Sequence, residues 1–428
     1  MADWLVLRMT SPPTALGDLR VLELCDERGQ YMGKLLADMG ADVIKVEPPG
    51  GDAARNVGPF LDDTPGPERS LHFWYHNTSK RAITLDLERP EGQRLLRELA
   101  RRADIVLESY PPGYLDSRGL GYRDLSALNP RLIMTSLTPF GQTGPYRDYL
   151  ASDLTLLALG GVMASCGYSE TDLPGAPPIR PDGGHAWYIG AHYGVASTLV
   201  ALLWRDLSGQ GQHLDVSIQQ AVSCTTEVAL PMWLYNNTVV IRQTGRHAAS
   251  FITPATQHAT KDGRYLNIFA TGRDPDAWKR LVEWLASEGM ADDLADPKYD
   301  DPLVRTGAAT HQEPYHVAEV LGRFFARHTA EELYQGGQAR GLPWSIVRYP
   351  EESLADEHFR DRGFFVEVPH PEVGRTLTYP GEPYRFSTTP WRLRRRAPLV
   401  GQDNAAVLGG ELGLSAGELD QLRRQGIV

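Results

Sequence analysis

The first 140 residues repeat a strand, helix, strand pattern, and this pattern limits the chain to a small set of folds. Residues 19–24 and 42–47 are short apolar segments typical of strands, and residues 31–39 between them carry apolar side chains at helical spacing. Such a βαβ unit has parallel strands and a right-handed connection. The chain therefore begins with a parallel sheet flanked by helices.

The pattern continues: we expect strands over 82–86, 103–108 and 132–137 and a helix over 90–102 that starts at a proline. Alternating strands and helices indicate an open α/β sheet, which binds ligands at the carboxyl ends of its strands. The loops of interest follow Leu24, Glu47, Glu108 and Leu137.

The later part of the chain is more mixed. Residues 213–250 indicate a helix followed by an extended passage, and residues 260–268 indicate a turn and a strand. Residues 274–329 are charged and helical in pattern. The tail returns to strand-like segments at 363–368 and 375–379 and ends in a capped helix after Ser415.

Charge excludes one class of partner. The 428 residues include 43 Lys and Arg against 54 Asp and Glu, a formal net charge of −11. This is the wrong sign for a protein whose main partner is nucleic acid. We therefore interpret the arginine-rich run at 392–396 as a solvated face.

Features that would place the chain in a membrane or an oxidising compartment are missing. The longest apolar stretch, 194–204, is shorter than the roughly 20 residues that cross a bilayer, and residues 1–15 lack the apolar core of a secretion signal. Cys25, Cys166 and Cys224 show neither disulfide nor zinc-site spacing. We predict a cytoplasmic protein with reduced thiols and no membrane partner.

Nucleotide-binding fingerprints are also missing, since the chain has no Gly-x-Gly-x-x-Gly and no Gly-x-x-x-x-Gly-Lys-Ser/Thr. Arg28-Gly29-Gln30 lies where the first strand feeds a helix, a position at which free backbone amides bind anions. Lys80, Arg81 and Arg118 are further candidates for phosphate contacts, although each alone is more typical of a surface charge.

Three side chains are candidates for acid, base or nucleophile. Asp153 follows Ser152 at a helix start, and Asp182 precedes two glycines and His185 at the start of a long apolar helix. Either aspartate alone is typical of a residue that caps helix backbone amides, and His185 is either a base near neutral pH or a polar residue at a helix mouth. No metal site is predicted, because paired-cysteine spacings are absent.

An ordered set of segments resembles the family III CoA-transferases, which include formyl-CoA transferase, the carnitine CoA-transferases and α-methylacyl-CoA racemase. The resemblance spans nearly the whole chain. Its segments are LADMGADVIKVEPPGGD (36–52), NTSKRAITLD (77–86), ADIVLESYPPG (103–113), FGQTGP (140–145), GQGQHLDVS (209–217) and APLVGQ (397–402).

This resemblance implies an α/β subunit with a Rossmann-like large domain formed by both chain ends and a smaller inserted domain. The corresponding boundaries are 1–224 for the first part of the large domain, 225–340 for the inserted domain and 341–428 for the return. It also implies a homodimer of interlocked rings, with coenzyme A or acyl-CoA as substrate and no permanently bound cofactor. By position, the CoA-contacting residues are Arg28, Gly29, Gln30, Lys80, Arg81, Ser109, Tyr110, Pro111 and Arg118.

The resemblance further implies an aspartate nucleophile that opens the long helix before the Gly-x-Gly-Gln signature. Counting back from Gln212 without gaps reaches Trp187, and the nearest carboxylate is Asp182. The racemase branch uses a His-Asp pair where this chain has Ser152-Asp153.

Three hypotheses remain. We predict a CoA-transferase that moves CoA between an acyl-CoA and a carboxylic acid through an acyl-enzyme on Asp182. The alternatives are an acyl-CoA isomerase, racemase or lyase that uses His185 and Asp153, and a noncatalytic acyl-CoA-binding protein.

Overall fold

The computed structural model describes residues 13–269, 271–308 and 310–428, so most of the segment weighed above for a secretion signal lies outside the described residues. The chain divides into two compact units. The first comprises Met1–Gly160, Asp182–Thr225 and Glu357–Val428, and the second comprises Gly161–Pro181 and Thr226–Asp356.

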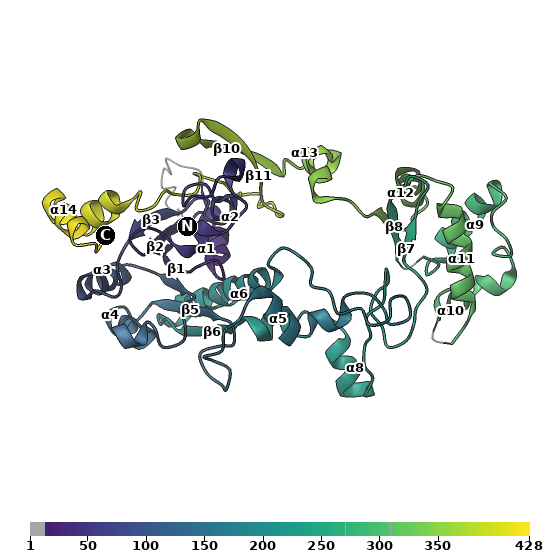
Figure 1. The fold of residues 1–428 in the computed structure, drawn as a ribbon, viewed down its shortest axis with the longest axis horizontal. Helices are drawn as coiled ribbons and strands as arrows, with labels where there is room; N and C mark the ends of the chain where they lie inside the picture. The colour runs from purple at the N-terminus through teal and green to yellow at the C-terminus, as the bar shows by residue number, and fades with distance from the viewer. Residues whose placement is uncertain (1–12, 270, 309) are drawn as a thin grey trace, which may run out of the picture. The chain divides into compact units, whose positions relative to one another are not determined.

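A six-stranded parallel sheet forms the centre of the first unit (Figure 1). The strand order is β3-β2-β1-β4-β5-β6, so the order reverses between β1 and β4. This arrangement confirms the predicted α/β class. The strands are β1 Arg20–Leu24, β2 Asp42–Glu47, β3 Arg81–Thr84, β4 Ile105–Glu108, β5 Ile133–Thr138 and β6 His213–Ser217.

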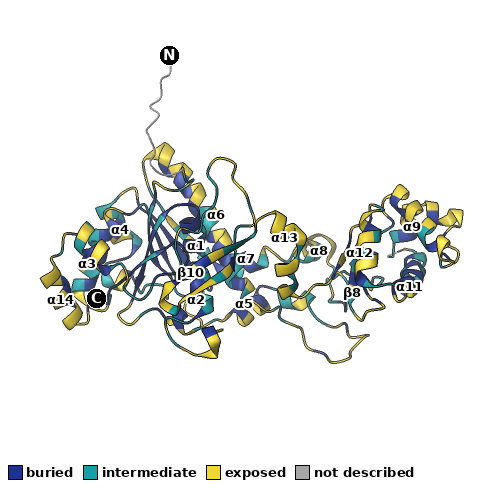
Figure 2. Cartoon of the chain, turned by 90° about the horizontal axis from the view of Figure 1, so that it is seen from above, coloured by how far each residue is buried: buried dark blue, intermediate teal, exposed yellow. Residues whose placement is uncertain are grey.

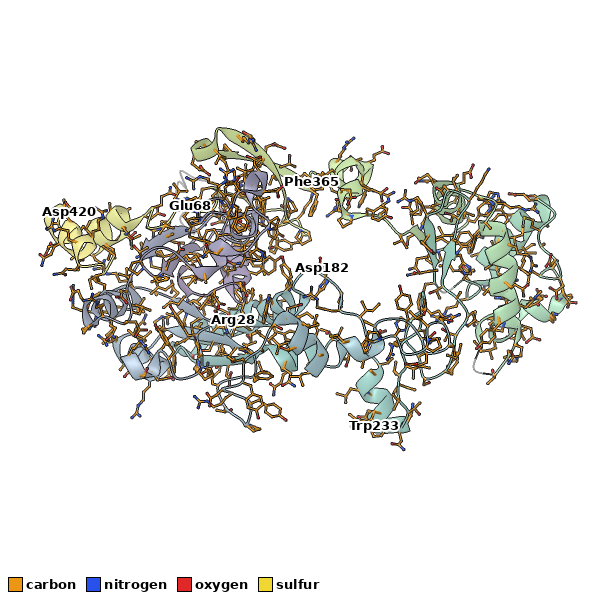
Figure 3. The ribbon with its side chains drawn as sticks, in the orientation of Figure 1. Arg28, Glu68, Asp182, Trp233, Phe365 and Asp420 are labelled. Atoms are coloured by element: carbon orange, nitrogen blue, oxygen red, sulfur yellow. The ribbon has the colours of Figure 1, made fainter. Side chains whose placement is uncertain are left out.

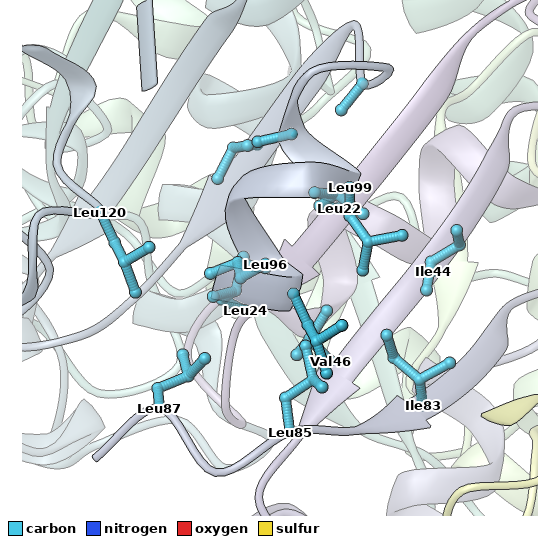
Figure 4. Close-up of a cluster of buried hydrophobic side chains, with 14 of the residues drawn as sticks. Leu22, Leu24, Ile44, Val46, Ile83, Leu85, Leu87, Leu96, Leu99 and Leu120 are labelled. Atoms are coloured by element: carbon cyan, nitrogen blue, oxygen red, sulfur yellow. The ribbon is translucent and has the colours of Figure 1, made fainter. Parts of the chain in front are cut away.

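One face of this sheet carries the main hydrophobic core (Figure 4). Alternate residues of β1 and β2, such as Leu22 and Ile44, pack there against Leu96 and Leu99. Helices α3 (Pro90–Ala100), α4 (Tyr122–Leu128) and α14 (Ala416–Arg424) contribute leucines to this core. Figure 2 shows these helices buried on one side and exposed on the other, as amphipathic surface helices are.

The opposite face is covered by α1 (Gln30–Asp38) and by the long helix α6 (His185–Ser208). This face is partly polar: Thr135 of β5 and Thr198 of α6 share a buried hydrogen bond of 2.7 Å. The remaining helices of the unit are α2 (Leu71–His76), α5 (Asp153–Leu159), α7 (Ile218–Ser223), α13 (Glu357–Asp361) and a turn of π-helix over Ala405–Glu411.

Among the described residues, α6 is the one helix long and apolar enough to cross a membrane by length and composition. It packs against α1, α5, α7 and β5, and its Arg205 forms an ion pair of 2.8 Å with Asp104. We therefore interpret α6 as a packing helix of the first unit.

One predicted element is wrong. The helix expected from residue 213 begins only at Ile218, because His213–Ser217 forms strand β6 beside β5. In β6 only Ser217 is buried, so this edge strand lacks the apolar pattern that identified the central strands. Its hydrogen bonds to β5 decide its conformation.

The carboxyl-terminal part of the chain completes the first unit. The two predicted strands form an antiparallel hairpin of β10 (Phe365–His370) and β11 (Arg375–Pro380). Farther on, Asn404 accepts a hydrogen bond of 2.9 Å from the backbone of Thr84 and donates one of 2.8 Å to its hydroxyl group. Residues 320 positions apart are thereby joined at β3.

The second unit has its own sheet and its own core. Three antiparallel strands, in the order β7-β8-β9, pack against helices around Trp278, Phe324 and Trp344. Its elements are α8 Ala229–Asn236, β7 Gln257–Ala259, β8 Tyr265–Ile268, α9 Pro275–Ser287, α10 Pro302–Thr306, α11 Glu313–Phe325, α12 Ala330–Gln338 and β9 Trp344–Ile346.

Candidate active site

A pocket lies at the carboxyl ends of β1, β2 and β4, beside the point where the strand order reverses. Open α/β sheets bind ligands at this position. The cavity volume is about 220 Å³. Its lining residues are Leu24, Cys25, Asp26, Arg28, Val46, Pro48, Asp52, Ala53, Ser109 and Tyr110. The pocket therefore contains three of the predicted CoA-contacting residues, namely Arg28, Ser109 and Tyr110.

Arg28 is held in place by Asp26. The two side chains form an ion pair of 2.5 Å, and the Arg28 backbone amide also donates to the Asp26 carboxylate. The Ser109 hydroxyl group donates to the same carboxylate at 2.9 Å and accepts from the Asp26 amide at 3.0 Å. Burial raises the pKa of Asp26, but the Arg28 guanidinium outweighs burial and lowers it below its ordinary value. The loops after β1 and β4 are thus joined through one carboxylate.

The other two residues of the predicted anion loop have different positions. Gly29 precedes the first turn of α1, and Gln30 is its first residue. The Gln30 side chain is fully buried, shares a hydrogen bond of 3.0 Å with His72 and accepts one of 2.9 Å from Asn77. Neither Gly29 nor Gln30 is among the lining residues of the pocket.

Lys80 lies beneath this loop, outside the pocket lining. Its ammonium group and that of Lys45 are fully buried and share the Glu23 carboxylate, at 2.7 Å and 3.3 Å respectively. Lys45 donates to the carbonyl group of Cys25 at 2.6 Å, and Lys80 donates to that of Gln30 at 2.7 Å. Two buried cations therefore fix both ends of the loop that carries Arg28.

The buried charges of this network influence one another. Burial lowers the pKa of Lys80 to about 8. Burial also acts to lower the pKa of Lys45, but the carboxylates of Asp52 and Glu23 raise it above its ordinary value. A methyl group on Gly33 would lie 1.5 Å from Glu23 Oε2, so glycine is needed where α1 passes this carboxylate. Sequence reasoning missed the role of Glu23, because no pattern marks a charged residue inside a strand as buried.

Arg81 lies at the other edge of the sheet. It is the first residue of β3, and it pairs with Asp42, the first residue of β2, and with Glu411 at 2.5 Å each. In a parallel sheet the first residues of the strands share the amino edge, opposite the carboxyl edge that forms the pocket. The structure therefore does not bring Arg81 to the pocket.

Arg118 ends a row of stacked side chains that begins in the pocket. Tyr110 stacks on Tyr114 with ring centroids 4.2 Å apart, and the Arg118 guanidinium lies 3.6 Å from the Tyr114 ring centroid. Arg118 also pairs with Glu88 at 2.6 Å. Burial raises the pKa of Tyr110 above its ordinary value, so its hydroxyl group stays protonated at neutral pH.

Pro111 lines a neighbouring cavity of about 220 Å³ at the ends of β4 and β5. Glu108 and Ser136 line it as well, and Ser136 shares a hydrogen bond of 2.9 Å with His213. Burial raises the pKa of Glu108 to about 7. This cavity therefore contains a carboxyl group that titrates near neutral pH.

The three candidate catalytic residues lie near the amino ends of α5 and α6. Asp153, in the first turn of α5, is buried and accepts a hydrogen bond of 2.7 Å from the backbone amide of Ala186, in the first turn of α6. His185 begins α6 and is exposed, and Asp182 is exposed in the loop before it. Figure 3 labels Asp182 in this loop and Arg28 on the part of the unit that holds the pocket.

The start of α6 contacts the start of α1. Tyr188 of α6 and Tyr31 of α1 meet edge to face with ring centroids 4.8 Å apart, and Tyr188 shares a hydrogen bond of 2.9 Å with His76. Burial lowers the pKa of His76 to about 3, so this imidazole is neutral at physiological pH. The loop that carries Arg28 and the helix that follows Asp182 are therefore joined by packed aromatic side chains.

No metal centre is indicated in the described ranges. Within residues 13–269, 271–308 and 310–428, no group of three or more His, Cys, Asp or Glu side chains is arranged to hold a metal ion.

The fold and the pocket define an α/β protein with a ligand site at the carboxyl edge of a parallel sheet. Comparison with known proteins then gives the family: the model of CoA-transferase family III matches residues 16–404, and the chain belongs to that family. This confirms the resemblance seen in the sequence and the prediction of an enzyme that moves CoA between an acyl-CoA and a carboxylic acid.

Relatives and solved structures agree with this assignment. The chain is 36% identical over 411 residues to the succinyl-CoA:(R)-benzylsuccinate CoA-transferase subunit BbsE of Thauera aromatica, covering 96% of this chain and 97% of the relative. It is 33% identical to the succinyl-CoA–D-citramalate CoA-transferase of Chloroflexus aurantiacus, covering 97% and 99%. The crystal structure of a CAIB/BAIF family protein from Brucella suis matches with a TM-score of 0.78 and 28% identity, over 93% of this chain and 99% of that one.

Proposed function

We propose that this CoA-transferase works through an acyl-enzyme on Asp182. One carboxylate oxygen attacks the thioester carbonyl carbon, the C–S bond breaks, and CoA leaves as a thiolate, so that the acyl group and Asp182 form a mixed anhydride. The thiolate then adds to the Asp182 carbonyl and releases the donor acid, which leaves an enzyme thioester. The acceptor carboxylate attacks this thioester, which releases the CoA thiolate and forms a second mixed anhydride. The thiolate attacks the acceptor carbonyl of that anhydride, which gives the product acyl-CoA and regenerates the Asp182 carboxylate. This mechanism needs a carboxylate that substrate can reach.

The observation that carries this proposal is the position of Asp182. It is exposed, and it lies two residues before Gly184, which begins α6 without a side chain of its own; Asp153 accepts the Ala186 amide there. Backbone amides at a helix start stabilise developing negative charge. Gly183 and Gly184 both have positive φ, of 105° and 70°, which lets the chain turn sharply between the carboxylate and the helix.

The pocket at the carboxyl edge of the sheet supports CoA binding by the same unit. We propose that Arg28 contacts a CoA phosphate, that Ser109 and Tyr110 form the adjoining wall, and that Asp153 and His185 position the reacting groups. Lys80 acts indirectly in this proposal, by fixing the loop that carries Arg28.

Mass spectrometry after incubation with a panel of acyl-CoAs, followed by hydroxylamine, tests the nucleophile. We expect a CoA or acyl adduct on the wild type, its absence from Asp182→Asn, and a transfer rate at least ~10³-fold lower in the variant. Asp420→Asn is the matched control, because Asp420 is an exposed aspartate paired with Arg423 at 3.0 Å and lies on the opposite side of the first unit (Figure 3). An adduct that persists in Asp182→Asn contradicts the proposal.

A second candidate function follows from Trp187, which stands where the ungapped count from Gln212 places the family aspartate. In this version the chain binds acyl-CoA as one subunit, and another chain of the same family supplies the carboxylate. The Thauera aromatica relative is named as a subunit, and a Chloroflexus aurantiacus relative, 30% identical, as a beta subunit. Purified alone, such a chain binds CoA but forms no adduct with any acyl-CoA.

We also propose a cytoplasmic homodimer of interlocked rings in which the two units are the large and the small domain. The exposed face of α6 supports a dimer, because it carries Val200, Leu203, Trp204 and Leu207 with 66%, 67%, 54% and 85% of their surface exposed in the single chain. Contiguous apolar surface of this kind marks an interface. The three cysteines are free thiols, as expected in a reducing compartment.

A further inference from the structure

The second unit contains a cavity that the proposed function does not use. Its volume is about 240 Å³, and it is lined by Phe251, residues 253–256, the end of β8, α10 and α11. Much of its wall is apolar, with Phe251, Ile268, Phe269, Val317 and Leu321 among the lining residues. Two arginines, Arg273 and Arg305, line it as well, and its lining includes no Asp or Glu.

Among the lining residues, Arg305 is a charged side chain that is almost completely buried. Only 3% of the residue is exposed, and backbone carbonyl groups hold its guanidinium: Nε donates to Gly272 at 2.8 Å, and Nη1 donates to Tyr299 at 2.5 Å and to Asp300 at 2.8 Å. The third nitrogen, Nη2, is buried and has no hydrogen-bond partner. No carboxylate in the described part of the chain forms an ion pair with it.

The carboxylates of Asp300 and Asp301 act on Arg305 through space without forming an ion pair with it. The buried Nη2 is therefore left without a hydrogen-bond acceptor, which is unfavourable unless a ligand supplies one. A carboxylate is the natural complement, because its oxygens accept charge-assisted hydrogen bonds from guanidinium N–H groups. Arg273 adds a second positive charge at the exposed side, where its guanidinium lies 5.5 Å from the Phe269 ring centroid. The local charge therefore favours an anion, and the apolar wall favours one with a hydrocarbon skeleton.

We infer that this cavity binds a small organic acid, with its carboxylate on Arg305 and its hydrocarbon part against the apolar wall. The volume of about 240 Å³ is below the roughly 300–1,000 Å³ of sites for drug-sized ligands, so the cavity suits a small acid. The acid is either a substrate acid of the transferase or a separate effector. This inference rests on the proposed function only in the choice of acids as ligands, and it does not depend on Asp182.

Isothermal titration calorimetry of the full chain with 3-phenylpropanoate tests the site, with 3-phenylpropanamide as the uncharged control. We expect the acid to bind and the amide to bind at least tenfold more weakly. Arg305→Gln raises the Kd for the acid at least tenfold, and Lys279→Gln, which removes an exposed charge from α9 outside the cavity, leaves it unchanged. Equal binding of acid and amide, or unchanged binding in Arg305→Gln, overturns the inference.

Two further variants keep the test valid if Arg305→Gln does not fold. Ala318→Leu adds volume from α11, a helix in which leucine is well tolerated, and Arg273→Gln removes the exposed charge of the wall. We expect a fivefold or greater rise in Kd for Ala318→Leu and a smaller rise for Arg273→Gln. Unchanged affinity in both variants overturns the inference.

Steady-state kinetics separate the two sources of the acid. If the cavity holds a substrate acid, Arg273→Gln raises the KM for that acid and leaves kcat unchanged. If it holds an effector, the KM values stay constant and the effect of added 3-phenylpropanoate on the rate disappears. Binding is measured also on Asp182→Asn, so that failure of the acyl-enzyme proposal leaves the result for this cavity intact.

Discussion

Glu108 shows how burial changes the chemistry of a single side chain. It ends β4, it is 4% exposed, and its carboxylate accepts a hydrogen bond of 2.7 Å from the Tyr110 amide. Burial nevertheless raises its pKa from 4.5 to about 7. The folded protein therefore holds a proton on Glu108 at pH values where the unfolded chain has lost it.

This shift makes stability depend on pH. Because the folded pKa is raised, the contribution of Glu108 is fully present below pH 4.5 and is lost as the pH rises through about 7. We expect Glu108→Gln, which keeps an acceptor for Tyr110, to gain up to roughly 3 kcal/mol relative to the wild type between pH 4.5 and 8. Urea unfolding of both proteins across this range measures the difference, and parallel curves would contradict the shift.

At the scale of elements, the decisive contact joins the amino ends of α5 and α6. Gly184 cannot cap α6 with a side chain, and Asp153 from α5 accepts the Ala186 amide instead. Ser152 and Thr155 form a capping box that fixes the start of α5, so the carboxylate is presented from a rigid turn. One aspartate thereby sets the position of the helix that follows Asp182.

We expect Asp153→Ala to lower the free energy of unfolding by about 1–2 kcal/mol, because an amide at a helix start loses its partner. Asp153→Asn retains an acceptor oxygen and loses less than half of that. Chemical denaturation of both variants tests this order independently of catalysis. If the two variants are equally stable, the Ala186 hydrogen bond does not support α6.

At the scale of the whole molecule, the exposed apolar residues of α6 require a partner surface. We expect light scattering to give twice the chain mass of 47.4 kDa. In the proposed interlocked dimer the subunits would fold and associate in one process, so we expect dilution or Leu203→Glu to yield unfolded or aggregated chain and no folded monomer. A stable, folded monomer of Leu203→Glu contradicts this prediction.

The sequence predicted where this pocket lies because topology follows from pattern. The first strands are apolar and evenly spaced, so the loops after Leu24 and Glu108 had to meet at one edge of a parallel sheet, and Arg28, Ser109 and Tyr110 do line one pocket there. The sequence alone could not show that Lys80 and Arg81 face different parts of the structure. These neighbours differ in burial, since Lys80 turns inward to Glu23 and Arg81 pairs with Asp42 at the opposite edge.

The sequence by itself determined the family, the α/β class and the succession of central strands and helices along the chain, because these depend on local apolar periodicity and on residues that keep their spacing along the chain. Only the tertiary structure decided which charges are buried and what they face. Strand β6, the Glu23 network and the surroundings of Arg305 depend on contacts between residues far apart in the sequence. The free energy of such a charge is set by its surroundings, and the surroundings exist only once the chain has folded.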